Sequence, residues 1–317
     1  MIGLADAALL AVVAMGCVRG SVALVTARWP RRSPAAAIAL WQALGLGGGL
    51  AAVGALLNLG VATQRAGVAG GVADVASRAA SGHLIRSGQA VLPAVLRILS
   101  TLTGLALLAV LCWILVAASA AVIRARRRQR ALLSLLAHGD PKAPGALVVD
   151  HPTAAAYCLP GLRSRIVVSV GALDLLRPAE LAAVLEHERA HLRERHDLVL
   201  LPFTAMRRAF GWSTVCADAQ RSVALLVEML ADDRALRALS PRALAAALVR
   251  FGMSGSGHAP AGTLGVARAR DEGEVAARVT RLLEPPPRLS APAVAGICCA
   301  ATLLVALPVV LLILPPT

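Results

Sequence analysis

The chain has 317 residues, of which 57% are hydrophobic and 16% are charged, and it carries a net charge of +14. This composition excludes an ordinary water-soluble protein, in which about a quarter of the residues are charged. The positive charge alone would fit nucleic-acid binding, but aromatic residues make up only 3% of the chain and form no basic-aromatic pattern. We therefore expect no direct nucleic-acid partner, and attribute much of the charge to arginines beside a lipid bilayer.

Four apolar blocks are each long enough to cross a bilayer, whose core needs about 20 helical residues. They cover roughly 4–27, 35–59, 98–123 and 292–314. In the second block, Gly45 and Gly49 have the spacing that allows close helix contact. The sequence thus predicts a multi-pass membrane protein, and it leaves the oligomeric state open.

Arginine clusters predict the orientation of these spans. They follow the first block and the third, and they precede the fourth: Arg28, Arg31 and Arg32; Arg124, Arg126, Arg127, Arg128 and Arg130; Arg278, Arg281 and Arg288. Because arginine-rich loops stay on the cytoplasmic side, the first loop and the segment 124–290 are expected to be cytoplasmic. Both termini are then outside the cell membrane.

The cytoplasmic segment shows alternating helix and strand patterns. An arginine-rich helix is expected from residue 124, and two β-rich runs, 146–150 and 165–170, form a strand pair around the Pro-Gly turn at 160–161. The remaining predictions are a helix from Pro178 to about 196, a helix over 216–237, a loop carrying His258 and a short helix ending in prolines before the fourth span.

The first of these helices carries the pattern His187-Glu188-Arg189-Ala190-His191. Residues i and i+4 lie on one helix face, so His187 and His191 can bind one metal ion while Glu188 faces a bound water. Neutral imidazole suits Zn²⁺, which lowers the pKa of bound water to about 7, and a glutamate there serves as general acid/base. The competing interpretation is an exposed, charge-rich helix, and a third ligand would decide between them.

Two candidates exist for that third ligand. Asp197 stands six residues after His191, but the glycine that such a pattern requires is replaced by Glu194. Glu228 and Asp232, four apart within an apolar helix, are the stronger pair. Glu228 is then the ligand, and Asp232 accepts a hydrogen bond from a ligating histidine. Asp197 is left as a residue near the ligands.

Another histidine of this helix, His196, follows His191 by five residues. On a continuous helix that spacing corresponds to about 140° around the axis. The sequence therefore predicts that His196 points away from the metal-binding face.

The order of these motifs resembles the gluzincin membrane peptidases. The HExxH pattern followed by Glu-x-x-Ala-Asp, with three spans before and one after, looks like the BlaR/MecR antirepressor metallopeptidases. The HtpX and CAAX prenyl proteases share the site but arrange their spans differently. The resemblance implies a mainly α membrane protein with four transmembrane helices. An α+β zincin-like domain, 124–290, is inserted between 1–123 and 291–317.

The resemblance also implies residue roles. His187, His191 and Glu228 would bind one zinc ion per chain, Glu188 would be catalytic, and Asp232 would support a ligand. Substrate peptide would add to an edge strand formed by Ala155, Ala156, Tyr157, Cys158 and Leu159. Two departures stand out, since Ala231 replaces a cysteine found in many antirepressors, and no penicillin-binding sensor domain follows the fourth span.

The expected function is a zinc endopeptidase that cuts a protein or peptide substrate at the cytoplasmic face. By analogy with the antirepressors, the substrate would be a transcriptional repressor, for example one of the winged-helix class. Two alternatives stay open: an HtpX-like quality-control protease, and a membrane scaffold or receptor that only binds a partner. Glu188 argues against the scaffold, which has no need of a catalytic base.

Overall fold

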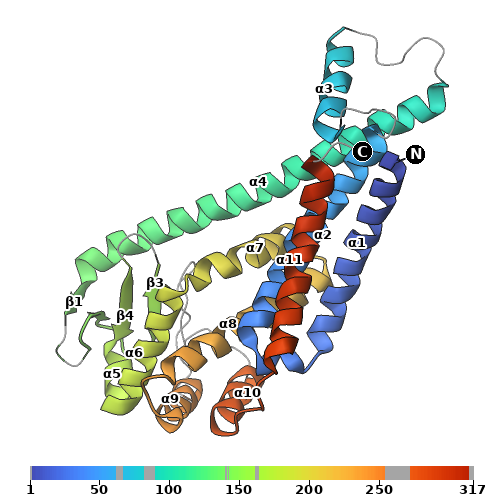
Figure 1. The fold of residues 1–317 in the computed structure, drawn as a ribbon. Helices are drawn as coiled ribbons and strands as arrows, with labels where there is room; N and C mark the ends of the chain where they lie inside the picture. The colour runs from blue at the N-terminus through green and yellow to red at the C-terminus, as the bar shows by residue number, and fades with distance from the viewer. Residues whose placement is uncertain are drawn as a thin grey trace. The chain divides into compact units, whose positions relative to one another are not determined.

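In the computed structural model, drawn as a ribbon in Figure 1, the chain folds into two compact units. The apolar unit comprises Met1–Pro30, Ala36–Ile114 and Leu289–Thr317, and the site unit comprises Arg31–Ala35 and Leu115–Arg288. The loop predicted around His258 and the predicted turn residue Gly161 lie outside the described residues. The structure describes residues 2–61, 67–81, 90–139, 141, 143–160, 164–253 and 272–313.

Among the described residues, four helices are long and apolar enough to cross a membrane, in agreement with the four predicted spans. They are α1 (Ile2–Thr26), α2 (Pro34–Val61), α4 (Val91–Leu136) and α11 (Ala291–Ile313). The stretch from residue 124 is helical as predicted, but it does not begin a new helix, because α4 continues through it as one helix of 46 residues. Arginine, alanine and leucine favour helix, and neither glycine nor proline interrupts this stretch.

Glycines on α2 allow its neighbours to approach closely. A Cβ added at Gly47 would lie 2.4 Å from the Leu304 backbone oxygen of α11, and one at Gly54 would lie 3.0 Å from Leu10 of α1. At Gly45 nothing lies within 4 Å, and at Gly49 the nearest atom is 3.7 Å away. Within the chain, the close helix contacts of α2 therefore lie at Gly47 and Gly54, and not at the Gly45/Gly49 pair whose spacing the sequence singled out.

Two short elements were not predicted in this part of the chain. A 3-10 turn, η1 (Trp29–Arg32), links α1 to α2, and α3 (Gly67–Ala80) follows α2. An ion pair joins Asp74 to Arg78 one turn later on α3. Such (i, i+4) pairs stabilise a helix.

The site unit contains a four-stranded sheet in the order β1-β2-β4-β3. Its strands are β1 (Ala137–Gly139), β2 (Ala146–Val149), β3 (Ala156–Leu159) and β4 (Arg165–Ser169). The predicted two-stranded pair is thus too small, although its two runs do pair, in parallel, as β2 and β4. β3 is antiparallel to β4 and lies at an edge.

In the described part of the site unit, six helices follow the sheet. Three of them, α5, α7 and α9, had no counterpart among the predicted helices. Their bounds are α5 (Val170–Leu175), α6 (Pro178–Arg193), α7 (His196–Ala209), α8 (Thr214–Ala235), α9 (Pro241–Met253) and α10 (Glu272–Leu283). The core of the site unit joins Val148 and Val168 of the sheet to Val184 of α6 and to Leu248 and Phe251 of α9, all at most 1% exposed.

Helix α6 begins as the sequence predicts and ends earlier. Pro178 occupies its first turn, and Glu180 accepts a hydrogen bond from the backbone N–H of Arg177. The helix ends at Arg193, and Arg195 adopts a left-handed conformation with φ of 51°, from which α7 starts. The break lets α7 leave in a new direction, with His196 buried at its first residue.

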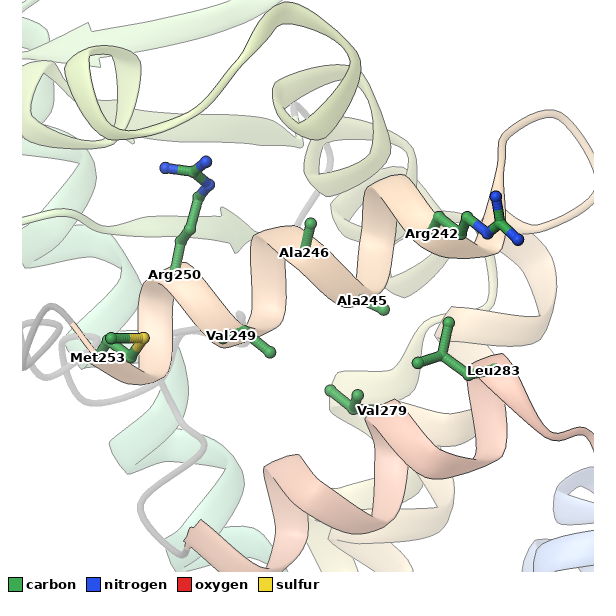
Figure 2. A pocket seen from close by; sticks show the side chains of 8 residues that line it. All are labelled: Arg242, Ala245, Ala246, Val249, Arg250, Met253, Val279 and Leu283. Atoms are coloured by element: carbon green, nitrogen blue, oxygen red, sulfur yellow. The ribbon is translucent and has the colours of Figure 1, made fainter.

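A cavity of about 510 Å³ lies between α9 and α10. Figure 2 shows Ala245 and Val249 of α9 facing Val279 and Leu283 of α10 across it. Its lining is mostly aliphatic and contains none of the residues predicted for catalysis or metal binding.

Candidate metal centre

Three potential metal ligands converge where α6 packs against α8. His187 Nε2 and His191 Nε2 are 3.1 Å apart. Glu228 of α8 places its Oε2 3.3 Å from His187 Nε2 and its Oε1 3.5 Å from His191 Nε2. One donor atom from each residue lies within 4.8 Å of the others. The helical spacing of the two histidines thus produces the juxtaposition that the sequence predicts.

Asp232 and Arg278 contact the candidate ligands on the side away from the point where the three donor atoms meet. Asp232 Oδ1 lies 2.9 Å from His187 Nδ1, the ring nitrogen that faces away from Glu228. Arg278 of α10 donates to both Asp232 oxygens at 2.7 and 2.8 Å and to Glu228 Oε2 at 2.9 Å. In the sequence, Arg278 indicates only membrane orientation, since it stands among the charged residues Glu274 and Arg281 of α10 and nothing marks it for this buried role.

Electrostatics favour ionised carboxylates in the centre. Burial lowers the pKa of His187, but hydrogen bonds with Asp232 and Glu228 outweigh it and raise that pKa to about 9. Burial lowers the pKa of His191 well below its ordinary value. For Asp232, burial raises the pKa, yet the Arg278 guanidinium and His187 lower it to about 2. Against the same effect of burial, His191 and Arg278 lower the pKa of Glu228.

The donor set fits a zinc ion. Two imidazole nitrogens and one carboxylate oxygen form one of the three-ligand sets found in hydrolytic zinc sites, which leave one position for water. Both histidines are fully buried, and the outward nitrogen of His187 already has its carboxylate partner. The residues present are therefore those that could hold one zinc ion.

Glu188 lies on the face of α6 that meets β3. It is fully buried, and its carboxylate lies close enough to the Cys158 thiol to interact with it electrostatically. Burial raises the pKa of Cys158, and the negative charge of Glu188 raises it further. Cys158 was predicted only as part of the edge strand, and the structure brings it into contact with the predicted catalytic carboxylate.

Some backbone N–H and C=O groups of β3 point to the open edge of the sheet. Ser169 N donates to Ala155 O, so the pairs Ala155–Ser169, Tyr157–Val167 and Leu159–Arg165 are the hydrogen-bonded ones of this antiparallel ladder. The backbone groups of Ala156 and Cys158 then point away from β4. All five predicted edge residues, 155–159, therefore lie on or beside the edge strand next to α6.

Asp197 forms an ion pair with an arginine of α4 and lies outside the group of candidate ligands. Its Oδ2 lies 3.0 Å from Arg126 Nη2 of α4, and its side chain is only 4% exposed. The group of converging donors consists of His187, His191 and Glu228, without Asp197.

The prediction that His196 points away is wrong. Its Nδ1 lies 2.9 Å from His191 Nδ1, and its ring is buried. The estimate of 140° assumed one continuous helix, whereas the left-handed Arg195 turns the chain between the two histidines. No glycine or proline marks this break in the sequence.

Fold and site together define a protein with four apolar helices long enough to span a membrane and a His-His-Glu centre on two packed helices, with both histidines buried. Residues 122–271 match peptidase family M48, a family of zinc metallopeptidases. The chain is also 47% identical over 53 residues to a protease HtpX homolog of Thermoplasma acidophilum. That similarity covers 17% of each chain. No solved structure matches.

Proposed function

We propose that this protein is a membrane-bound zinc endopeptidase. The observation that carries the proposal is the convergence of His187, His191 and Glu228 within 4.8 Å, with Glu188 on the same helix. The M48 match over this region supports the same reaction class. In this proposal the site lies at the cytoplasmic face, with both termini on the other side, as the arginine distribution favours.

The chain's own residues divide the work in peptide hydrolysis. His187, His191 and Glu228 would hold the zinc ion, which supplies Lewis acidity to water and to the scissile carbonyl. Asp232 fixes the proton of His187 on Nδ1, so that Nε2 stays available as a ligand. Glu188 accepts the proton of the attacking water and returns it to the leaving amine. Ala156 and Cys158 hold the substrate as an added strand through their backbone groups.

Substitution of the acid/base tests this function. Purified wild type supplied with zinc should cut an unfolded test protein in detergent, and Glu188→Gln should reduce the rate by about 10²-fold or more. Glu186→Gln is the matched control, since Glu186 lies on the same helix and pairs with Arg189. Equal rates for wild type and Glu188→Gln would contradict the proposal.

Two substrate classes have separate support. The order of spans resembles the antirepressors and favours a transcriptional repressor, for example of the winged-helix class. The similarity to a protease HtpX homolog favours damaged membrane proteins instead. Proteins retained by Glu188→Gln in membranes, identified after crosslinking, would separate these classes. A zinc-loaded wild type without proteolysis of either class would favour the binding scaffold.

A further inference from the structure

The two histidines proposed as zinc ligands have different partners at Nδ1, the ring nitrogen that does not face the other ligands. A ligating histidine nearly always donates its second N–H to an acceptor, which fixes the tautomer and the ring orientation. For His187 that acceptor is the Asp232 carboxylate, 2.9 Å away. For His191 the nearby group is another imidazole, that of His196, with 2.9 Å between the two Nδ1 atoms.

The direction of the His191–His196 hydrogen bond follows from ligation. His191 uses Nε2 toward Glu228 and His187, so its proton must sit on Nδ1 when a metal is bound. His196 Nδ1 must then accept that proton's hydrogen bond. A neutral imidazole that accepts on Nδ1 carries its own proton on Nε2.

Beyond His196 lie a carboxylate and a guanidinium that suit this arrangement. His196 Nε2 lies 3.4 Å from Glu194 Oε2. The other oxygen of Glu194 forms an ion pair with Arg234 of α8. An acceptor therefore lies near each proton: His196 Nδ1 is beside His191 Nδ1, and the Glu194 carboxylate, paired with Arg234, is near His196 Nε2. At 3.4 Å this last contact is an electrostatic one and not a hydrogen bond.

This chain of contacts depends on the break between α6 and α7. The left-handed conformation of Arg195 changes the direction of the chain, so that His196 does not lie where a continuous helix would place it. The two rings meet edge to face with centroids 4.9 Å apart, and both are at most 1% exposed. Such a conformation is unfavourable for a non-glycine residue, and it is retained where surrounding contacts stabilise it.

We propose that His196 is a positioning residue, which holds His191 in the Nδ1-protonated tautomer and aims its Nε2 at the metal. Glu194 and Arg234 keep His196 in the tautomer that can accept. This inference rests on the proposed zinc site. It assigns His196 no contact with substrate or with the metal.

The test compares two substitutions of similar size in the full-length protein. His196→Phe keeps a ring but removes the acceptor, whereas His196→Asn places an amide oxygen near the former Nδ1. The zinc dissociation constant is measured by competition with a chelator, beside the melting temperature of the metal-free protein. His196→Phe should weaken zinc binding by about 10- to 100-fold, and His196→Asn should restore most of the loss.

A purely structural role for His196 would lower the metal-free melting temperature in both variants and leave the zinc affinity unchanged, which would overturn the proposal. If wild type itself binds no zinc, the proposed function fails instead.

A second measurement decides the case in which His196→Phe does not fold. In zinc-loaded wild type, ¹⁵N NMR of histidine should show His191 protonated at Nδ1 and His196 at Nε2, with coupling between the two Nδ1 atoms across the hydrogen bond. A His196 protonated at Nδ1 would overturn the proposal.

Discussion

At the scale of residues, the centre is a set of charges that neutralise one another. Two carboxylates, Glu228 and Asp232, share the buried Arg278, and each of them also contacts a histidine. Buried charges are tolerated only when they are paired and hydrogen-bonded. Arg278 thus lets the chain keep two ionised carboxylates side by side in the apolar interior of the site unit.

Removal of the Arg278 guanidinium should therefore lower the free energy of unfolding of the site unit. We expect Arg278→Met to lower stability by about 3–5 kcal/mol, because it leaves two buried carboxylates without their cation. Arg221→Met is the control, since Arg221 pairs with Asp218 on the surface of α8 and should cost about 0.5 kcal/mol or less. Melting temperatures in detergent provide the comparison, and equal values for the two variants would contradict this role.

The pKa of His187 predicts how zinc binding depends on pH. Its folded pKa of about 9 exceeds the ordinary value of 6.5, so the metal-free fold gains stability from this proton below about pH 6.5. That gain is lost as the pH rises through 9. Zinc must displace the same proton from Nε2, so its affinity should rise about tenfold per pH unit between 6.5 and 9. Chelator competition at pH 7 and pH 8 would measure the slope, and a flat profile would refute it.

At the scale of elements, hydrophobic and charge patterns predicted the helices and strands that local sequence determines. Periodicity and composition were enough to predict the four apolar helices, α6 with its proline start, α8, and the strand runs of β2 and β4. His187, His191 and Glu228 could be predicted as a group because each pair of candidate residues lies one helical turn apart.

What could not be predicted depends on tertiary contacts. The end of α6 is set by the burial of His196 and by the pairing of Asp197 with Arg126 of α4, distant in sequence. The role of Arg278 requires α10 to pack near α8, which periodicity does not reveal. The edge position of β3 was expected only from the family resemblance, because periodicity does not reveal that its neighbour in the sheet is the later strand β4.

Packing of α2 gives a test at this scale. Gly47→Ala would place a Cβ 2.4 Å from a backbone oxygen of α11, so the helices must separate. Gly45→Ala, two residues away, meets nothing within 4 Å and should be neutral or slightly stabilising. We expect the Gly47 variant alone to lose about 1–3 kcal/mol. Detergent melting curves in which both variants match wild type would contradict the helix contact.

At the scale of the whole molecule, the metal should link two helices that are distant in sequence. α6 supplies two of the proposed ligands and α8 the third, so zinc would bind the folded site unit in preference to the unfolded chain. Ligands of this kind stabilise a protein by an amount that rises with their concentration, about 2.7 kcal/mol at 100 times the dissociation constant.

Chelation should consequently lower the melting temperature of wild type, and restored zinc should raise it again. Glu228→Ala should show little response to either treatment, whereas Glu188→Gln should respond as wild type does. Differential scanning fluorimetry with and without a chelator makes the comparison. A wild type that melts at the same temperature in both conditions would argue against a metal that joins α6 to α8.

The zinc content of purified protein tests the proposed centre directly when it is measured for wild type, Glu188→Gln and Glu228→Ala. We expect one zinc ion per chain in wild type and in Glu188→Gln, with a marked loss in Glu228→Ala. A wild type without zinc, or a Glu228→Ala variant that holds as much zinc as wild type, would contradict the His187–His191–Glu228 centre.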